Sequence, residues 1–153
     1  MSSLRLLALC ALLLVTGYGL CASESGIFYA QPGQKVEVRL ELRLPPQFAL
    51  QKRSQFWLIS PFAGKLLEAK ASGRDWPQDP QHYLQSFDLL VWKLKVPAGT
   101  IAGRYPLQFK ATVYACDEGL GLCQKHALKA VGSLVVGQQE GTSKLVRLEL
   151  PRP

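Results

Sequence analysis

One stretch of this sequence restricts the possible fold more than any other. Residues 35–44 read K-V-E-V-R-L-E-L-R-L, so aliphatic side chains alternate strictly with charged ones. Because successive side chains of a β-strand point to opposite faces of the sheet, this period of two indicates a strand with one buried and one wet face. Pro45 and Pro46 follow at once, and neither can donate a hydrogen bond to a neighbouring strand. The stretch therefore predicts a half-buried strand that ends before the two prolines.

The same pattern recurs along the rest of the chain, between glycine and proline residues that favour turns. Residues 66–71 fit either a short strand or a helical turn, and residues 73–80 read as a polar loop that carries Trp76. The other strand-like segments are residues 55–60, 87–96, 104–116, 126–136 and 144–150. No long helical pattern interrupts them, so the sequence predicts an all-β sandwich of about seven strands. Its core should include Val38, Leu40, Leu42, Phe109, Ala111 and Val113.

The first residues have the pattern of an export signal. Arg5 precedes an apolar run over residues 6–15, which is too short to span a bilayer. Cys21 and Ser23 then fit the small-x-small pattern that a signal peptidase cleaves. We expect residues 1–23 to be a signal peptide and residues 24–153 to form one domain. The mature protein should be secreted or periplasmic, without a transmembrane segment.

The N-terminus of the exported protein tests the predicted cleavage site directly. Mass spectrometry of the secreted product should find it between Ala22 and Gly26, and an intact Met1 would contradict the expectation. A lipoprotein anchored through Cys21 is the alternative. That processing needs a small residue before the cysteine, whereas Leu20 stands there.

Composition and motifs exclude several function classes. The formal charge is +7, but lysine and arginine are scattered along the predicted strands rather than clustered with aromatic residues, so we expect no nucleic-acid partner. The chain has no G-x-S-x-G, P-loop, dinucleotide-binding or H-E-x-x-H motif. His82 and His126 are its only histidines, and neither lies in a recognisable catalytic motif. We expect no cofactor and no hydrolase activity.

Cleavage of the signal would leave Cys116 and Cys123 as the only cysteines. Six residues, two of them glycine, separate them at the junction of two predicted strands, which suits a hairpin. Facing residues of antiparallel strands have Cα atoms about 4.5–5.5 Å apart, within the range that a disulfide spans. The sequence predicts a disulfide across this hairpin.

Two roles for this disulfide remain open. Closing a loop of about eight residues stabilises a fold by roughly 2.5 kcal/mol, against roughly 4.7 kcal/mol for a loop of about a hundred residues. Its position therefore favours redox use over a structural role. Without redox use, the chain would be a noncatalytic sandwich module that binds a protein partner and keeps a structural disulfide.

A metal site is a third interpretation of the same segment. Cys116, Cys123 and His126 are soft ligands that suit zinc or copper(I). However, the spacing C-x6-C-x2-H is not a standard one, and alternation along a strand places Cys123 and His126 on opposite faces. We expect no metal here.

The cysteine segment also resembles a known family. A strand ending in residues 113–116, a short acidic loop with glycine and then Cys123 are similar to the N-terminal periplasmic domain of the thiol:disulfide interchange protein DsbD. Residues 40–50 and 94–100 resemble the β-sandwich domain that ends thioredoxin-containing NHL-repeat proteins. The similarity covers most of residues 30–137.

The resemblance implies an immunoglobulin-like antiparallel sandwich in which Cys116 and Cys123 are the redox pair. In that family an aromatic loop caps the cysteines, which points to Tyr83, with Trp76 as a second candidate. The partner would be a separate thioredoxin-like protein, and we expect the chain to be a monomer. Any enzymatic activity would be that of a thiol-disulfide oxidoreductase.

The charged residues next to each cysteine suggest which sulfur would form the mixed disulfide and which would resolve it. Positive charge favours the thiolate, and carboxylates oppose it. Asp117 and Glu118 follow Cys116, whereas Lys125 and His126 follow Cys123. The residues thus predict that Cys123 is the more acidic thiol and forms the mixed disulfide, and that Cys116 resolves it.

Overall fold

The structure, a computed structural model, describes residues 23–137 and 141–151, and in these residues it contains strands and no helix. The strands are β1 (Ser23–Glu24), β2 (Gly26–Ala30), β3 (Lys35–Arg43), β4 (Phe48–Gln51), β5 (Gln55–Ile59), β6 (Leu67–Ala69), β7 (Gly73–Asp75), β8 (Tyr83–Phe87), β9 (Leu90–Lys95), β10 (Gly103–Asp117), β11 (Leu122–Val136) and β12 (Val146–Glu149). The predicted signal, residues 1–23, lies outside the described residues except for Ser23.

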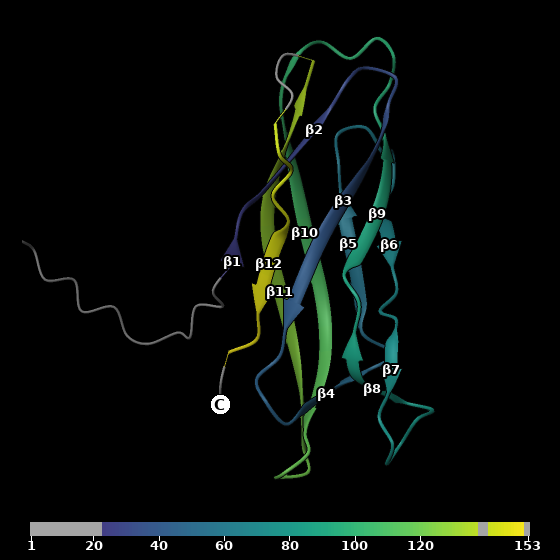
Figure 1. Ribbon diagram of the computed structural model, residues 1–153, viewed down its shortest axis with the longest axis vertical. Helices are drawn as coiled ribbons and strands as arrows, with labels where there is room; N and C mark the ends of the chain where they lie inside the picture. Colours follow the sequence, from purple (N-terminus) through teal and green to yellow (C-terminus); the bar gives the residue numbers. More distant parts are fainter. Residues whose placement is uncertain (1–22, 138–140, 152–153) are drawn as a thin grey trace, which may run out of the picture.

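The strands form two sheets that pack face to face, so the predicted all-β sandwich is confirmed (Figure 1). One sheet has the order β1-β12-β3-β9. The other has the order β2-β11-β10-β4-β8-β7, and β5 pairs with both β10 and β6. Strands β10 and β11 form a long hairpin that runs the length of the molecule, with its tip at the same end as β4, β7 and β8.

The strands are more numerous than the sequence predicts, and several are shorter, whereas β10 and β11 are longer. The predicted strand over residues 87–96 begins at Leu90, and a separate strand, β8, ends at Phe87. The predicted loop over residues 73–80 begins with strand β7, which pairs with β8. The glycine at position 73 permits this close approach, since a Cβ atom there would be 2.1 Å from the Ser86 carbonyl oxygen. Two pairs, β2 with β11 and β3 with β12, are parallel rather than antiparallel.

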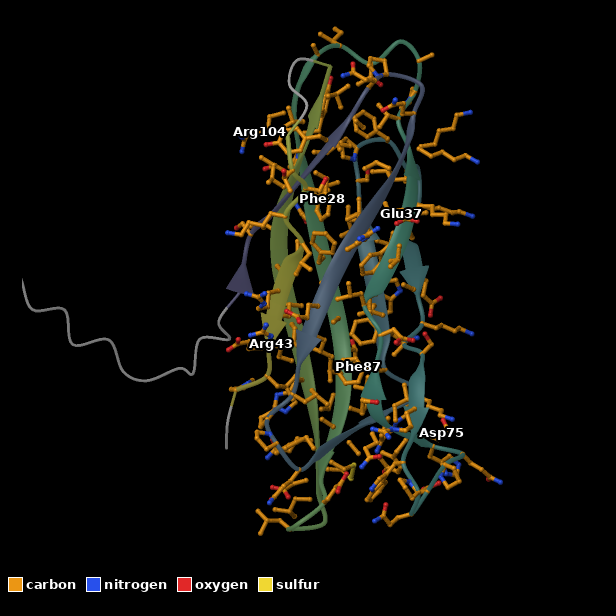
Figure 2. All side chains as sticks on the ribbon, in the orientation of Figure 1. Phe28, Glu37, Arg43, Asp75, Phe87 and Arg104 are labelled. Carbon is orange, nitrogen blue, oxygen red and sulfur yellow. A yellow bond between two sulfur atoms is a disulfide. The ribbon has the colours of Figure 1, made fainter. Side chains whose placement is uncertain are left out.

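The core lies between the two sheets, where side chains fill the space (Figure 2). All six residues expected in the core are buried there: Val38, Leu40, Leu42, Phe109, Ala111 and Val113. Trp92 from one sheet meets Phe109 from the other edge to face, with ring centroids 5.6 Å apart. The indole N–H of Trp92 donates to the Leu67 carbonyl at 2.9 Å, which satisfies its one polar group. This pair forms part of the contact between the two sheets.

Candidate functional site

The predicted disulfide is confirmed, and it joins the two strands of the long hairpin close to its tip. Cys116 on β10 faces Cys123 on β11 directly, with their Cα atoms 4.0 Å apart. Because Ala115 points into the core, alternation places Cys116 and Cys123 on the opposite face of the sheet. The disulfide therefore lies on the outer side of the larger sheet.

The two sulfur-bearing residues differ in their access to solvent. Cys116 is 5% exposed, whereas Cys123 is exposed. A thiolate can exchange with a disulfide only by attacking one of the two sulfur atoms, which must be accessible to it. Cys123 is therefore the more accessible residue of the pair, and Cys116 is covered.

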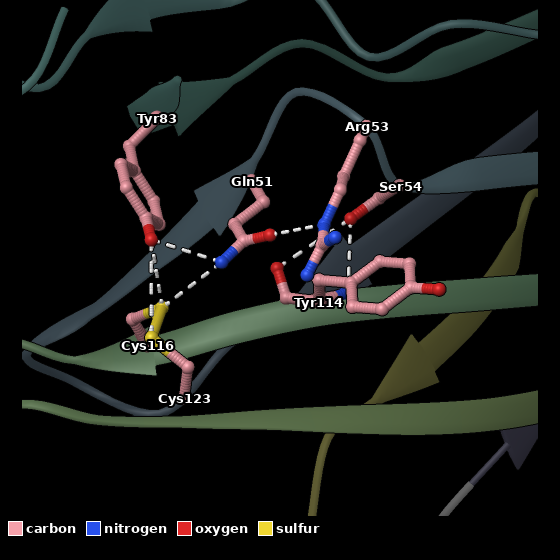
Figure 3. Close-up of a disulfide and its surroundings, with 7 residues drawn as sticks. All are labelled: Gln51, Arg53, Ser54, Tyr83, Tyr114, Cys116 and Cys123. Carbon is pink, nitrogen blue, oxygen red and sulfur yellow. Dashed lines mark hydrogen bonds between the residues drawn. A yellow bond between two sulfur atoms is a disulfide. The ribbon is translucent and has the colours of Figure 1, made fainter.

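Tyr83 and Gln51 cover Cys116 and supply hydrogen bonds to its sulfur (Figure 3). The Tyr83 hydroxyl donates to Cys116 Sγ at 3.3 Å and lies 3.8 Å from Cys123 Sγ. The Gln51 side-chain amide donates to Cys116 Sγ at 3.4 Å and to the Tyr83 hydroxyl oxygen at 2.9 Å. Cys116 Sγ thus faces two donors that would favour negative charge on it.

A change of strand pairing brings Gln51 to this position. Strand β10 pairs with β4 near its end and with β5 further back, and residues 52–54 form the turn between β4 and β5. The buried Ser54 hydroxyl fills the gap by accepting from the Tyr114 backbone N–H at 2.9 Å. Since a buried N–H without a partner is costly, this bond stabilises the turn that follows Gln51.

The turn also places Arg53 beside the site. Its guanidinium stacks over the Tyr114 ring at 4.0 Å from the centroid, and its Nε donates to the Gln51 side-chain oxygen. Lys125 lies over the same ring at 5.7 Å. Two cations thus lie near one aromatic ring, and of these two, Arg53 donates a hydrogen bond to a residue that touches the disulfide.

The two aromatic residues suggested as a cap lie together. Tyr83 pairs with Gln51 across β8 and β4 and contacts both sulfurs. Trp76 packs edge-on against Tyr83, with ring centroids 5.3 Å apart, and its backbone N–H donates to the Tyr83 carbonyl at 3.0 Å. Tyr83 therefore covers the disulfide directly. Trp76, which follows the end of β7, packs against Tyr83.

The two residues suggested as tuning groups lie on opposite faces of β11. Lys125 is opposite Tyr114 on the side of the disulfide. His126 is opposite the core residue Val113, and its buried Nε2 has no hydrogen-bond partner among the described residues. The described residues also contain no group of three histidine, cysteine or acidic side chains close enough to hold a metal.

Several polar residues next to Tyr83 were not among the predicted site residues. A hollow of about 350 Å³ opens there, lined by Gln51, Lys52, Arg53, Asp79, Gln81, His82 and Tyr83. His82 pairs with Asp79 at 2.9 Å, and Lys52 pairs with Asp75 at 2.7 Å. The run Gln51 to Ser54 is polar between two strands, but only the observed pairing shows that it reaches the cysteines.

Comparison with known proteins does not assign the chain to a family. No protein-family model matches it, and no curated protein sequence matches it. The described residues include no helix long and apolar enough to cross a membrane. The geometry around Cys116 and Cys123 is therefore the basis on which a function can be proposed.

Proposed function

We propose that this protein is an exported thiol-disulfide exchange domain. Its Cys116–Cys123 pair would pass electrons to or from a thioredoxin-like protein, with the chain acting as a monomer in the periplasm or outside the cell. The observation that carries the proposal is the asymmetry of the pair. Cys123 is open to attack, and Cys116 lies beneath the hydrogen-bond donors Tyr83 and Gln51.

The exchange would take two steps in the direction of reduction. A thiolate of the partner attacks Cys123 Sγ, the bond between the two sulfurs breaks, and its electron pair leaves on Cys116 as a thiolate. The partner's second thiolate then attacks the partner sulfur that is bonded to Cys123. This step forms the partner's disulfide and releases Cys123 as a thiolate. The products are the dithiol form of this protein and the disulfide form of the partner. The reverse sequence oxidises this protein.

A purely structural role for the Cys116–Cys123 disulfide would add little to the stability of the fold. The β10–β11 ladder already runs without a break in register from Gly103–Val136 to Asp117–Leu122. The disulfide closes only the short tip of this hairpin. Closing a loop of this length stabilises a fold by roughly 2.5 kcal/mol, and by less where hydrogen bonds between the strands already hold the ends together. A disulfide that persists also suits an oxidising compartment outside the cytosol.

Reaction with a dithiol protein tests the proposal. Mixing the oxidised protein with reduced thioredoxin should produce free thiols on Cys116 and Cys123, counted by alkylation and mass spectrometry. The same protein without thioredoxin is the control. A disulfide that stays intact with excess reduced thioredoxin, in the folded protein, would show that the bridge is structural.

Tyr83→Phe should slow this reduction on the order of tenfold, because a hydrogen bond to a charged group contributes about 1.5–3 kcal/mol. The ring of Tyr83 remains and still covers Cys116, while the donor to the departing thiolate is lost. Tyr114→Phe is the matched control on the same face of the sheet, and it should leave the rate unchanged. Stopped-flow measurement of thiol release gives both rates, and equal rates for the two variants would contradict the assigned role of Tyr83.

A further inference from the structure

We infer that Arg53, Gln51 and Tyr83 form a directed chain of hydrogen bonds that stabilises the thiolate of Cys116 and so makes Cys116 the leaving sulfur. Gln51 and Tyr83 touch the reacting sulfur. Arg53 acts through Gln51 and is a positioning residue. The inference rests on the proposed exchange function and adds which residues set the direction of bond breaking.

The chain has one direction because of its first member. A guanidinium can only donate hydrogen bonds, so Arg53 Nε must face the oxygen of the Gln51 amide. The amide nitrogen is then turned the other way, and its two hydrogens meet the Tyr83 hydroxyl oxygen at 2.9 Å and Cys116 Sγ at 3.4 Å. Arg53 thereby excludes the flipped amide, which would present an oxygen to the sulfur.

The Tyr83 hydroxyl is oriented by the same logic. Its oxygen accepts from Gln51, so its single hydrogen is free to point at Cys116 Sγ, 3.3 Å away. Donors from Gln51 and Tyr83 therefore converge on Cys116 Sγ. Hydrogen bonds in such a series polarise one another, and the positive end of this one is the charge of Arg53.

The other charged groups near Cys116 do not supply this effect. Asp117 turns its carboxylate into the hairpin tip, where Oδ1 accepts from the backbone N–H groups of Gly119 and Leu120 at 2.8 and 3.2 Å. Glu118 is exposed at the tip. Lys125 lies over Tyr114 and is not joined by a hydrogen bond to the Cys116 cover.

The other titratable side chains near the cover form contacts with one another. His82 pairs with Asp79 and Lys52 pairs with Asp75, in the segments on either side of Tyr83. Arg53 interacts with the neutral side chains of Gln51 and Tyr114, and no ion pair in the described part of the chain joins its guanidinium to a carboxylate. Arg53 is therefore the cation that the chain directs toward the sulfur.

The proposed chain differs from one part of the sequence-based expectation. The residues next to each cysteine predict that Cys123 is the more acidic thiol, whereas the donors brought in from β4 and β8 converge on Cys116. Cys123 remains the sulfur that forms the mixed disulfide, because it is the exposed one. Cys116 departs from it as the stabilised thiolate.

The experiment measures thiolate formation at Cys116 directly. In the exported Cys123→Ser protein Cys116 is the only thiol, and its ultraviolet absorbance reports the pH midpoint at which the thiolate forms. Gln51→Glu, which replaces the amide donor with a carboxylate, should raise this midpoint by about one pH unit, a tenfold loss of thiolate. Arg53→Gln should raise it in the same direction. Both replaced side chains lie at the surface or partly exposed, and circular dichroism checks that the variants are folded.

Lys125→Gln is the matched control, because it removes the other cation over the same Tyr114 ring. It should move the midpoint much less than Arg53→Gln. Equal shifts for the two variants, or no shift for Gln51→Glu, would overturn the inference even if thioredoxin reduces the disulfide. If thioredoxin leaves the wild-type disulfide intact, the exchange function fails, and the midpoints still decide whether the chain stabilises the thiolate.

Discussion

The Cys116→Ser protein is expected to accumulate a mixed disulfide through Cys123 on the order of ten times faster than the Cys123→Ser protein does through Cys116, because exchange depends on access to the attacked or attacking sulfur. Cys123 is exposed near the tip of the hairpin, whereas Cys116 is 5% exposed beneath Tyr83 and Gln51. The expected difference follows from burial and does not depend on which thiol is the more acidic.

The measurement uses a thioredoxin whose resolving cysteine is replaced by serine and whose remaining thiol is activated as an aromatic disulfide. Each single-cysteine variant is mixed with this reagent, and the covalent complex is quantified by intact-mass spectrometry. The double-serine variant gives the background. Equal rates for the two variants would contradict the assignment of Cys123, and absence of a complex with either would contradict the exchange function.

Phe109→Ala should lower the free energy of unfolding by about 3–5 kcal/mol, which is the usual cost of removing a buried aromatic side chain. Phe109 is 1% exposed, packs edge to face with Trp92 of the opposite sheet and lies against Gly132. Because single domains are stable by about 5–15 kcal/mol, this one change would remove a large share of the total. Urea unfolding followed by tryptophan fluorescence measures the difference.

Lys110→Ala on the same strand is the control, since the Lys110 side chain is exposed and faces away from the core. It should change the free energy of unfolding by about 0.5 kcal/mol or less. A loss of under about 1 kcal/mol for Phe109→Ala would mean that the two sheets do not pack through this pair, because a core cavity of that size costs more.

The sandwich could be predicted because its core follows a local pattern. Alternation over residues 35–44 and 104–116 fixes which side chains are buried, and the structure buries the predicted ones. Strand pairing is not local, so the parallel pair of β3 with β12 and the break between β8 and β9 could not be predicted. The close approach at Gly73 likewise depends on its partner strand.

The candidate site likewise contains residues that could be predicted from the sequence and residues that could not. The cysteine pair follows from a hairpin and its spacing, and the observed register joins Cys116 to Cys123 as predicted. Tyr83 came from a resemblance, and the structure places it against both sulfurs. Gln51 and Arg53 carry no sequence signal of their own, because they reach Cys116 only through the turn between β4 and β5 and its Ser54 bond to Tyr114.

The reduction potential of the Cys116–Cys123 pair tests the central claim most directly. The folded protein would be equilibrated with thioredoxin of known poise, and the fraction of each form determined by alkylation and mass spectrometry. Structural disulfides of secreted proteins have potentials below about −300 mV, whereas exchanging pairs lie higher. The exposed Cys123 and the stabilised Cys116 thiolate predict a potential above that value. A potential below it would contradict the exchange function and leave the disulfide as a structural bridge.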